Sequence, residues 1–215
     1  MAAFPEPEPI TLDEASQSLV DPGFAVIRGF LDAFTVSDLR TETEALRDQG
    51  SLREAAVGRG EGKEVRSEIR SDRVLWIDSS SLTRPQCEYQ RAMEALRERL
   101  NRDLFLGLSD LEAHLACYPL GAFYKPHLDC HRGVSTRVVT AIVYLNDEWR
   151  REDGGLLRLY TDPVAGTAGS ATEIVPEAGK LVLFRAADFW HEVLPARRER
   201  FSLTGWFRTR DSTLV

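Results

Sequence analysis

The sequence is poor in several residue types and patterns, and these shortages narrow its class. It has only three cysteines, Cys87, Cys117 and Cys130, which are too few and too scattered for a disulfide framework. We therefore expect reduced thiols and a cytoplasmic setting. No apolar run approaches the length of a membrane span, and residues 1–9 lack the apolar core of a signal peptide. We expect no membrane partner.

Basic residues are in deficit as well. A net charge of −7 and a pI near 5.2 argue against a nucleic-acid partner, which would need a basic patch. Lysine occurs only at Lys63, Lys125 and Lys180, and we interpret the preference for arginine as coding bias of a GC-rich, bacterial genome. At 215 residues and 43% hydrophobic content, with no repeat or change of composition, we expect one domain over residues 1–215, present as a monomer.

The first half of the chain has mainly helical patterns. A capping box begins at Thr11, Thr35 is placed to cap a second helix, and apolar residues form one stripe on a third. Residues 51–67 are polar and rich in glycine, which is typical of a mobile loop. We expect a flexible lead-in at 1–9, helices at 11–20, 35–50 and 85–104, and strands at 24–30 and 73–78.

After Ser109 the apolar pattern changes to the two-residue period of strands, interrupted by glycine and proline turns. Residues 10–108 would supply helical support, early strands and the loop, and residues 109–210 a β domain. The fold class that this predicts is α+β, a double-stranded β-helix (jelly-roll) with the N-terminal helices packed on one sheet. We expect strands at 112–118, 124–128, 137–145, 156–160, 173–175, 180–184, 191–194 and 201–208.

A possible metal site lies within this β region. His127 and Asp129 are two residues apart, so at a strand end their side chains share one face. Such a pair is common by chance, and His191 taken alone could be a buried structural histidine. Together, however, two imidazoles and one carboxylate can bind Fe(II) and leave positions open for oxygen chemistry. Arg200 adds a fixed cation that can hold a dicarboxylate co-substrate, which points to 2-oxoglutarate.

The strand that begins at Arg200 has two different faces. Its odd positions, Phe201, Leu203, Gly205 and Phe207, suit packing against helices, whereas its even positions, Arg200, Ser202, Thr204, Trp206 and Arg208, suit a ligand-lined interior. The alternative is a sandwich strand whose polar face meets solvent. In the strand 137–145, Tyr144 can offer a hydroxyl to the same pocket or can belong to the core.

Several motifs, in this order along the chain, resemble those of the prolyl 4-hydroxylases that depend on Fe(II) and 2-oxoglutarate. The similarity is to the branch that contains the animal hypoxia-inducible-factor prolyl hydroxylases and their bacterial relatives. The motifs are IRSDRVLWI at 69–77, ACYP at 116–119, HLD at 127–129, TAIVYLN at 140–146 with Trp149, GGLLR at 154–158, HEVLP at 191–195 and RFSLTGW at 200–206.

The resemblance implies roles for individual residues. His127, Asp129 and His191 would bind iron, and Arg200 and Tyr144 would hold the distal carboxylate of 2-oxoglutarate. The other implied roles are Tyr118 and Thr204 near the co-substrate, Trp206 as a wall of the pocket, and Arg137, Arg70, Asp72 and Tyr124 at the mouth where a proline enters. An exposed salt bridge is the alternative for Arg70 and Asp72. The cofactors would be Fe(II), 2-oxoglutarate and O2, with ascorbate as reductant.

The expected reaction converts 2-oxoglutarate to succinate and CO2 and hydroxylates a proline of a protein partner, for which the bacterial relatives suggest a translation elongation factor. Gly58–Gly62 would act as a lid or be a plain loop. His131 would lie at the rim, although it could compete as a ligand. Two other readings stay open: the same chemistry on a free amino acid or small metabolite, and a non-catalytic metal-binding barrel.

Overall fold

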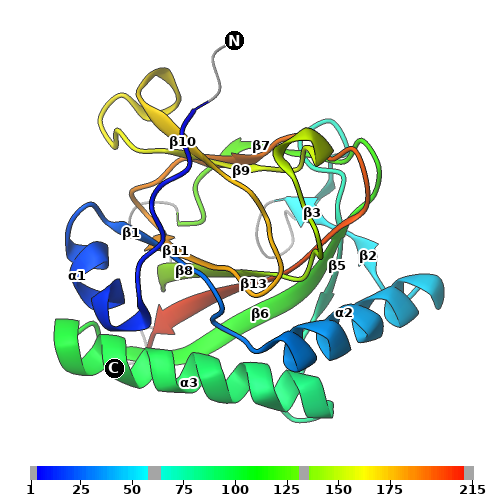
Figure 1. The fold of residues 1–215 in the computed structure, drawn as a ribbon, viewed down its shortest axis with the longest axis horizontal. Helices are drawn as coiled ribbons and strands as arrows, with labels where there is room; N and C mark the ends of the chain where they lie inside the picture. The colour runs from blue at the N-terminus through cyan, green and yellow to red at the C-terminus, as the bar shows by residue number, and fades with distance from the viewer. Residues whose placement is uncertain (1–3, 58–63, 131–135, 211–215) are drawn as a thin grey trace.

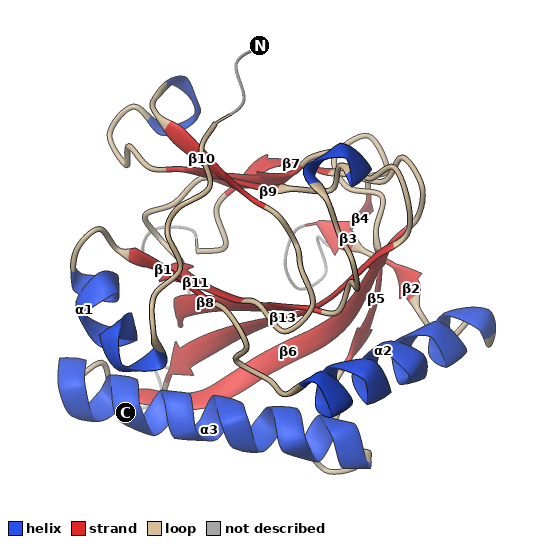
Figure 2. Ribbon diagram, viewed as in Figure 1, coloured by secondary structure: helices blue, strands red, loops and turns tan. Residues whose placement is uncertain are grey.

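The computed structural model describes residues 4–57, 64–130 and 136–210, and in it two antiparallel sheets lie face to face with the long helices beneath the larger one (Figures 1 and 2). The larger sheet has the order β1-β11-β8-β13-β6-β5-β2, and the smaller has the order β10-β9-β12-β7. This confirms the predicted α+β double-stranded β-helix.

The elements follow the predicted order. The helices are α1 (Ala15–Val20), α2 (Ala33–Asp48) and α3 (Arg84–Leu104), with short 3-10 turns η1 (Leu12–Glu14), η3 (Arg151–Asp153) and η4 (Gly166–Ala168). The strands of the first half are β1 (Phe24–Ile27), β2 (Arg53–Glu54), β3 (Ala56–Val57), β4 (Glu64–Val65) and β5 (Arg73–Trp76). Those of the second half are β6 (Leu108–Tyr118), β7 (Tyr124–His127), β8 (Arg137–Tyr144), β9 (Leu157–Tyr160), β10 (Ala171–Ile174), β11 (Leu181–Arg185), β12 (His191–Val193) and β13 (Arg200–Thr209).

The helices cover the outer face of the larger sheet because each buries one apolar stripe. In α3, Tyr89, Met93, Leu96 and Leu100 are all buried and belong to the same core cluster as Phe201, Leu203 and Phe207 of β13. The helix-packing face predicted for β13 is therefore confirmed. No helix in the described ranges is both long and apolar enough to cross a membrane.

The start of α2 corrects one prediction. Asp32, and not Thr35, caps the helix: its side chain accepts hydrogen bonds from the backbone N–H groups of Phe34 and Thr35. Thr35 instead donates its hydroxyl to the same carboxylate, at 2.6 Å. Both residues are good caps, and only the local backbone geometry decides which one stands outside the first turn.

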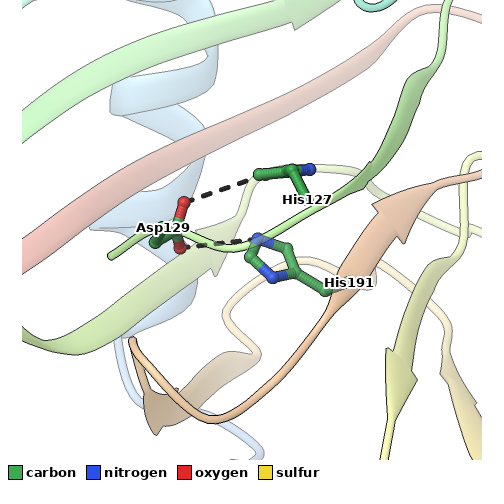
Figure 3. A group of neighbouring side chains, drawn as sticks. All are labelled: His127, Asp129 and His191. Atoms are coloured by element: carbon green, nitrogen blue, oxygen red, sulfur yellow. Dashed lines mark ion pairs between the residues drawn. The ribbon is translucent and has the colours of Figure 1, made fainter. Parts of the chain in front are cut away.

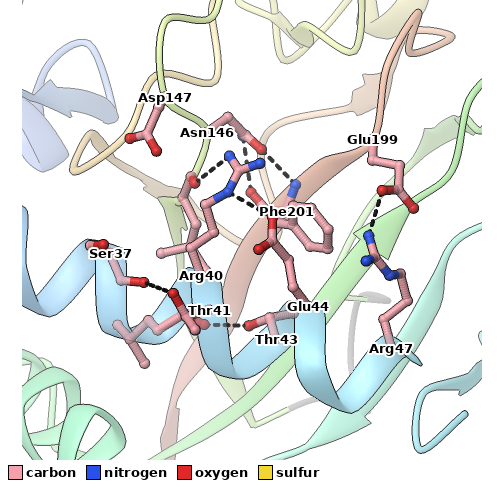
Figure 4. A network of polar contacts seen from close by, with 12 residues as sticks. Ser37, Arg40, Thr41, Thr43, Glu44, Arg47, Asn146, Asp147, Glu199 and Phe201 are labelled. Atoms are coloured by element: carbon pink, nitrogen blue, oxygen red, sulfur yellow. Dashed lines mark hydrogen bonds and ion pairs between the residues drawn. The ribbon is translucent and has the colours of Figure 1, made fainter. Parts of the chain in front are cut away.

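Helix α2 also fixes the point where β13 begins (Figure 4). The guanidinium groups of Arg40 and Arg47 lie over the Phe201 ring, and Arg47 forms an ion pair with Glu199. The buried side chain of Asn146 donates to the Phe201 carbonyl at 3.0 Å and accepts from the Phe201 N–H at 2.7 Å. The Asn146 amide pairs with both backbone groups of Phe201, as a neighbouring strand would. It therefore holds the position of the backbone next to Arg200.

Two stretches expected to be irregular have more structure than the sequence predicted. Within residues 51–67, Arg53–Glu54 pairs with β5, and Ala56–Val57 pairs with Glu64–Val65. In the lead-in, Thr172 donates its hydroxyl to the Pro5 carbonyl, and Glu6 forms an ion pair with the buried Lys180. Strand pairing orders the first stretch and partners distant in sequence order the second, and local composition reveals neither.

Candidate active site

The three residues predicted to bind metal lie together at one end of the smaller sheet. His127 ends β7 and His191 begins β12, and their Cα atoms are paired in the ladder. Asp129 lies two residues beyond His127, with its carboxylate turned toward both imidazoles (Figure 3). The distance from Asp129 Oδ1 to His127 Nε2 is 3.8 Å, and that from Oδ2 to His191 Nε2 is 3.4 Å. One potential ligand atom from each residue falls within 4.8 Å of the others.

Hydrogen bonds prepare both imidazoles to bind through the same atom. His127 Nδ1 lies 2.8 Å from the Lys125 carbonyl, and His191 Nδ1 lies 3.1 Å from the Phe189 carbonyl. Because a carbonyl can only accept, each Nδ1 carries the proton and each Nε2 is left with a lone pair facing Asp129. The Thr140 hydroxyl donates to Asp129 Oδ2 at 2.7 Å and orients the third ligand.

The electrostatics of the cluster favour the protonation states that a metal requires. Burial, with the charge of His191 acting in the same direction, lowers the pKa of His127 to about 3. Burial alone would raise the pKa of Asp129, but His191 and His127 outweigh it, so this pKa lies below its ordinary value. At neutral pH the cluster therefore offers a neutral His127 and an ionised Asp129.

Arg200 is buried inside the barrel without a matching negative charge. It is only 1% exposed, and in the described part of the chain no carboxylate lies within 4.0 Å of it. Its Nε donates to the Gly155 carbonyl at 2.8 Å and its Nη1 to the Ser202 hydroxyl at 3.4 Å. A buried cation without a counter-charge is unfavourable, so this position calls for an anionic ligand.

Tyrosines and a glycine complete the surroundings of Arg200. Its guanidinium carbon lies 4.8 Å from the ring centre of Tyr118 and 5.0 Å from that of Tyr144. The buried Tyr144 hydroxyl has no hydrogen-bond partner among the described residues, and burial raises its pKa to about 12. Gly155 has φ of +62°, and a Cβ there would approach Arg200 Cδ to 2.9 Å. Gly155 belongs to the GGLLR motif, but no role was predicted for it, because that role depends on Arg200 passing across it.

The residues predicted for the mouth form a column that ends at His127 of the candidate metal cluster. Arg70 donates from Nε to Asp72 at 2.7 Å, and its guanidinium carbon lies 4.3 Å from the Tyr124 ring centre. The Tyr124 ring stacks on His127 with centroids 3.5 Å apart. The alternative of an exposed salt bridge is wrong, because the Asp72 side chain is 0% exposed and that of Arg70 is 13% exposed.

The remaining predicted residues lie on the interior face of the larger sheet. Arg137 stacks on Trp206, with its guanidinium carbon 3.6 Å from the ring centre. Thr204 points to the same interior side of β13, opposite His114 of β6 in the ladder. Gly58–Gly62 and His131 lie outside the described residues. The sequence reasoning missed Glu112 and His114, which lie on β6 four and two residues, respectively, before Ala116 of the ACYP motif.

The fold and the cluster together define a class: a double-stranded β-helix with a facial His–Asp–His set and a buried arginine, which is the arrangement of non-haem Fe(II) oxygenases. Comparison with known proteins agrees. Residues 113–208 match the family model described as the 2OG-Fe(II) oxygenase superfamily.

Two solved structures and one curated relative are similar over most of the chain. A Pseudomonas putida prolyl-4-hydroxylase is 40% identical, with a TM-score of 0.82, over 94% of this chain and 100% of its own. A Trichoplax adhaerens prolyl hydroxylase, solved with a peptide of the hypoxia-inducible-factor oxygen degradation domain, is 25% identical, with a TM-score of 0.78, over 92% of this chain and 88% of its own. Human Egl nine homolog 1 is 30% identical over 88% of this chain, which spans 44% of that protein.

The chain belongs to the prolyl hydroxylase family of the 2OG-Fe(II) oxygenase superfamily. That family uses Fe(II), 2-oxoglutarate and O2, and the residues fit the metal and the 2-oxoglutarate. The cluster offers two imidazole nitrogens and one carboxylate, and the unmatched charge of Arg200 and the unpartnered Tyr144 hydroxyl suit the distal carboxylate of a dicarboxylate.

Proposed function

We propose that this protein hydroxylates a proline of a protein partner, with His127, Asp129 and His191 as iron ligands and Arg200 and Tyr144 as the anchor of 2-oxoglutarate. When bound, the iron, 2-oxoglutarate and O2 supply the oxidising chemistry, in which 2-oxoglutarate becomes succinate and CO2 and one oxygen atom enters the substrate. The observation that carries the proposal is the buried Arg200 without a counter-charge, beside the triad.

Each neighbouring side chain has a place in this scheme. Tyr118 and Thr204 border the 2-oxoglutarate position from the same interior face, and Gly155 leaves room for the Arg200 side chain. Trp206, held against Arg137, forms the wall of the substrate pocket. The column from Asp72 through Arg70 to Tyr124 orders the opposite side of the mouth and supports His127.

A protein substrate is supported by the relatives. The Trichoplax enzyme was solved with a peptide fragment, and its similarity covers 92% of this chain. A free amino acid would need only the inner site, whereas a protein substrate would also use Arg70, Arg137 and Trp206 at the proposed mouth. A translation elongation factor is the first partner to test. Ascorbate as reductant and a monomeric state are further predictions of the same proposal.

Intact-mass analysis of host proteins tests the substrate directly. The purified enzyme is incubated with a host lysate, Fe(II), 2-oxoglutarate and ascorbate, and we expect one protein to gain one oxygen atom on a proline. The matched control is the same incubation with Arg200→Ala enzyme, which should give no such product. Hydroxylation of free amino acids in place of any protein would establish the small-molecule alternative instead.

Excision of Gly58–Gly62 separates the roles of loop and metal centre. If this segment orders over a bound protein, its removal should impair hydroxylation of the protein much more than the uncoupled turnover of 2-oxoglutarate. Equal losses in both assays would show that the segment supports the fold and does not contact the partner.

A further inference from the structure

One cluster near the mouth has no part in the scheme above. Glu112 of β6 lies between two arginines: its Oε1 accepts from Arg137 Nη2, and its Oε2 accepts from Arg208 Nη1 at 2.8 Å. Asp110, two residues earlier on the same strand, accepts from Arg208 Nε at 2.7 Å. The carboxylate of Glu112 is thus shared between the arginine that lies on Trp206 and one at the end of β13.

Arg137 belongs to a stack of side chains that also contains Trp206, His114 and Trp76. Arg137 covers one part of the indole at 3.6 Å, while the His114 ring lies 5.4 Å from that of Trp206. Trp76 of β5 packs edge-on against His114 at 4.9 Å and is 47% exposed, so the stack reaches the molecular surface. His114 is held by neighbouring strands, whereas the Arg137 side chain is long and needs a partner to stay flat on the ring.

Stability does not explain the Glu112 cluster. The side chains of Arg137, Glu112 and Arg208 are between 24% and 34% exposed, and ion pairs with this access to solvent contribute little to folding. The Glu112 carboxylate instead orients Arg137. It binds one edge of the guanidinium, so that the flat face of the guanidinium lies on the Trp206 indole.

We infer that Glu112 is a positioning residue for substrate recognition: it holds Arg137 against Trp206 and so shapes the wall that meets the residues flanking the target proline. This rests on the proposed function. The peptide that fits must present a flat or apolar side chain to the Arg137–Trp206 pair, because both carboxylate oxygens of Glu112 already accept hydrogen bonds from arginines.

Steady-state kinetics of Glu112→Gln test the inference. This variant keeps the shape of the side chain and removes its charge. With the host protein identified by intact mass as substrate, we expect KM to rise roughly tenfold, as for the loss of one charge-assisted hydrogen bond, and kcat to change much less. The matched control is Asp110→Asn, because Asp110 lies on the same strand as Glu112 and its charge binds Arg208 but not Arg137. This variant should leave KM near the wild-type value.

A double-mutant cycle tells positioning from direct contact. If Glu112 acts through Arg137, adding Glu112→Gln to Arg137→Ala should not raise KM further. Fully additive effects, or a change in KM for Asp110→Asn as large as that for Glu112→Gln, would overturn the inference.

A fluorescence measurement tests the same inference without any substrate. Acrylamide quenching is compared between proteins with and without Trp206→Phe, so that the difference reports on Trp206 alone. Glu112→Gln should make Trp206 more accessible to acrylamide, and Asp110→Asn should not. Unchanged access in Glu112→Gln would refute the positioning role. Failure of the wild-type enzyme to hydroxylate any protein would refute only the proposed function, because the quenching result does not depend on it.

Discussion

On strand β13, the side chains that face the helices and those that face the barrel interior are both largely buried, but only one set is explained by packing. Phe201, Leu203 and Phe207 are 0% exposed within one continuous apolar cluster. On the other face, Arg200 has no carboxylate partner among the described residues, and the Trp206 indole N–H has no hydrogen-bond partner there. A folded chain leaves few buried polar groups unpaired, so the interior face has been shaped for something that binds.

The difference shows where stability and function are separated in this fold. The odd-numbered residues of β13 pack in the core, and its even-numbered residues face the barrel interior, so neighbouring residues have different roles. On the helix-facing side, the buried Tyr89 hydroxyl also has no hydrogen-bond partner in the described chain. Hydrogen bonding is therefore incomplete on that side too. On the interior side, in contrast, the unmatched groups include a full charge, that of Arg200.

Loss of a metal ligand should give the largest effect on the interior face. His191→Ala removes one of two imidazoles, and we expect turnover of 2-oxoglutarate to fall to background and Fe(II) affinity to fall by at least about 100-fold. Calorimetric titration with Mn(II) as a redox-stable probe measures the affinity. The circular dichroism spectrum should stay that of the wild type, and turnover at the wild-type rate would show that the triad is not the metal centre.

On the helix-facing side, truncation should act on stability. Leu203→Ala leaves a cavity in a fully buried site and should cost about 2–5 kcal/mol of unfolding free energy, measured by urea denaturation. The affinity for 2-oxoglutarate of the fraction that stays folded should not change. A weaker affinity with normal stability would mean that the two faces are not separable.

Arg200→Ala should show the reverse pattern. Without the guanidinium, the distal carboxylate of 2-oxoglutarate loses its partner, which should cost about 2–5 kcal/mol of binding free energy. Metal binding should remain, and unfolding free energy should fall far less than in Leu203→Ala, because an unmatched buried charge is removed. Arg200→Lys keeps the positive charge but loses the forked pair of donors. Its affinity for 2-oxoglutarate should therefore lie between those of the wild type and of Arg200→Ala. Unchanged 2-oxoglutarate affinity in Arg200→Ala would contradict the anchor.

The pH dependence of stability should give the smallest effect per step of the experiment, because it is spread over several pH units. Burial lowers the pKa of His114 to about 3, so between pH 6.5 and about 3 this histidine takes up a proton only in the unfolded chain. Unfolding free energy must then fall as pH falls through this window, by up to about 1.4 kcal/mol per pH unit for one histidine. Metal-free His114→Phe should show a shallower slope than the wild type in urea titrations over this range, and an identical slope would show that His114 is not buried as a neutral ring.

Much of the fold and of the candidate site could be predicted from the sequence, because the patterns that indicate them are periodic or lie within short segments. The alternation in residues 200–208 separated the two faces of β13, and the spacing of His127 and Asp129 placed both at one strand end. The prediction failed at the start of α2, where Asp32 and Thr35 are both competent caps. It also failed where the partner is distant, because composition does not indicate that Arg53–Glu54 pairs with β5. Glu112 is an ordinary surface glutamate until the fold brings Arg137 and Arg208 beside it.

The sequence by itself determined the class of fold, the ligand types and the residue that carries the fixed positive charge, because period, spacing and side-chain chemistry are properties of short segments. Only the tertiary structure decided that His191 pairs with His127 across two strands, that Arg200 is buried without a counter-charge, and that Arg70 and Asp72 are buried under Tyr124. Burial and distance between remote segments are set by how the two sheets close on each other, and no short segment contains that information.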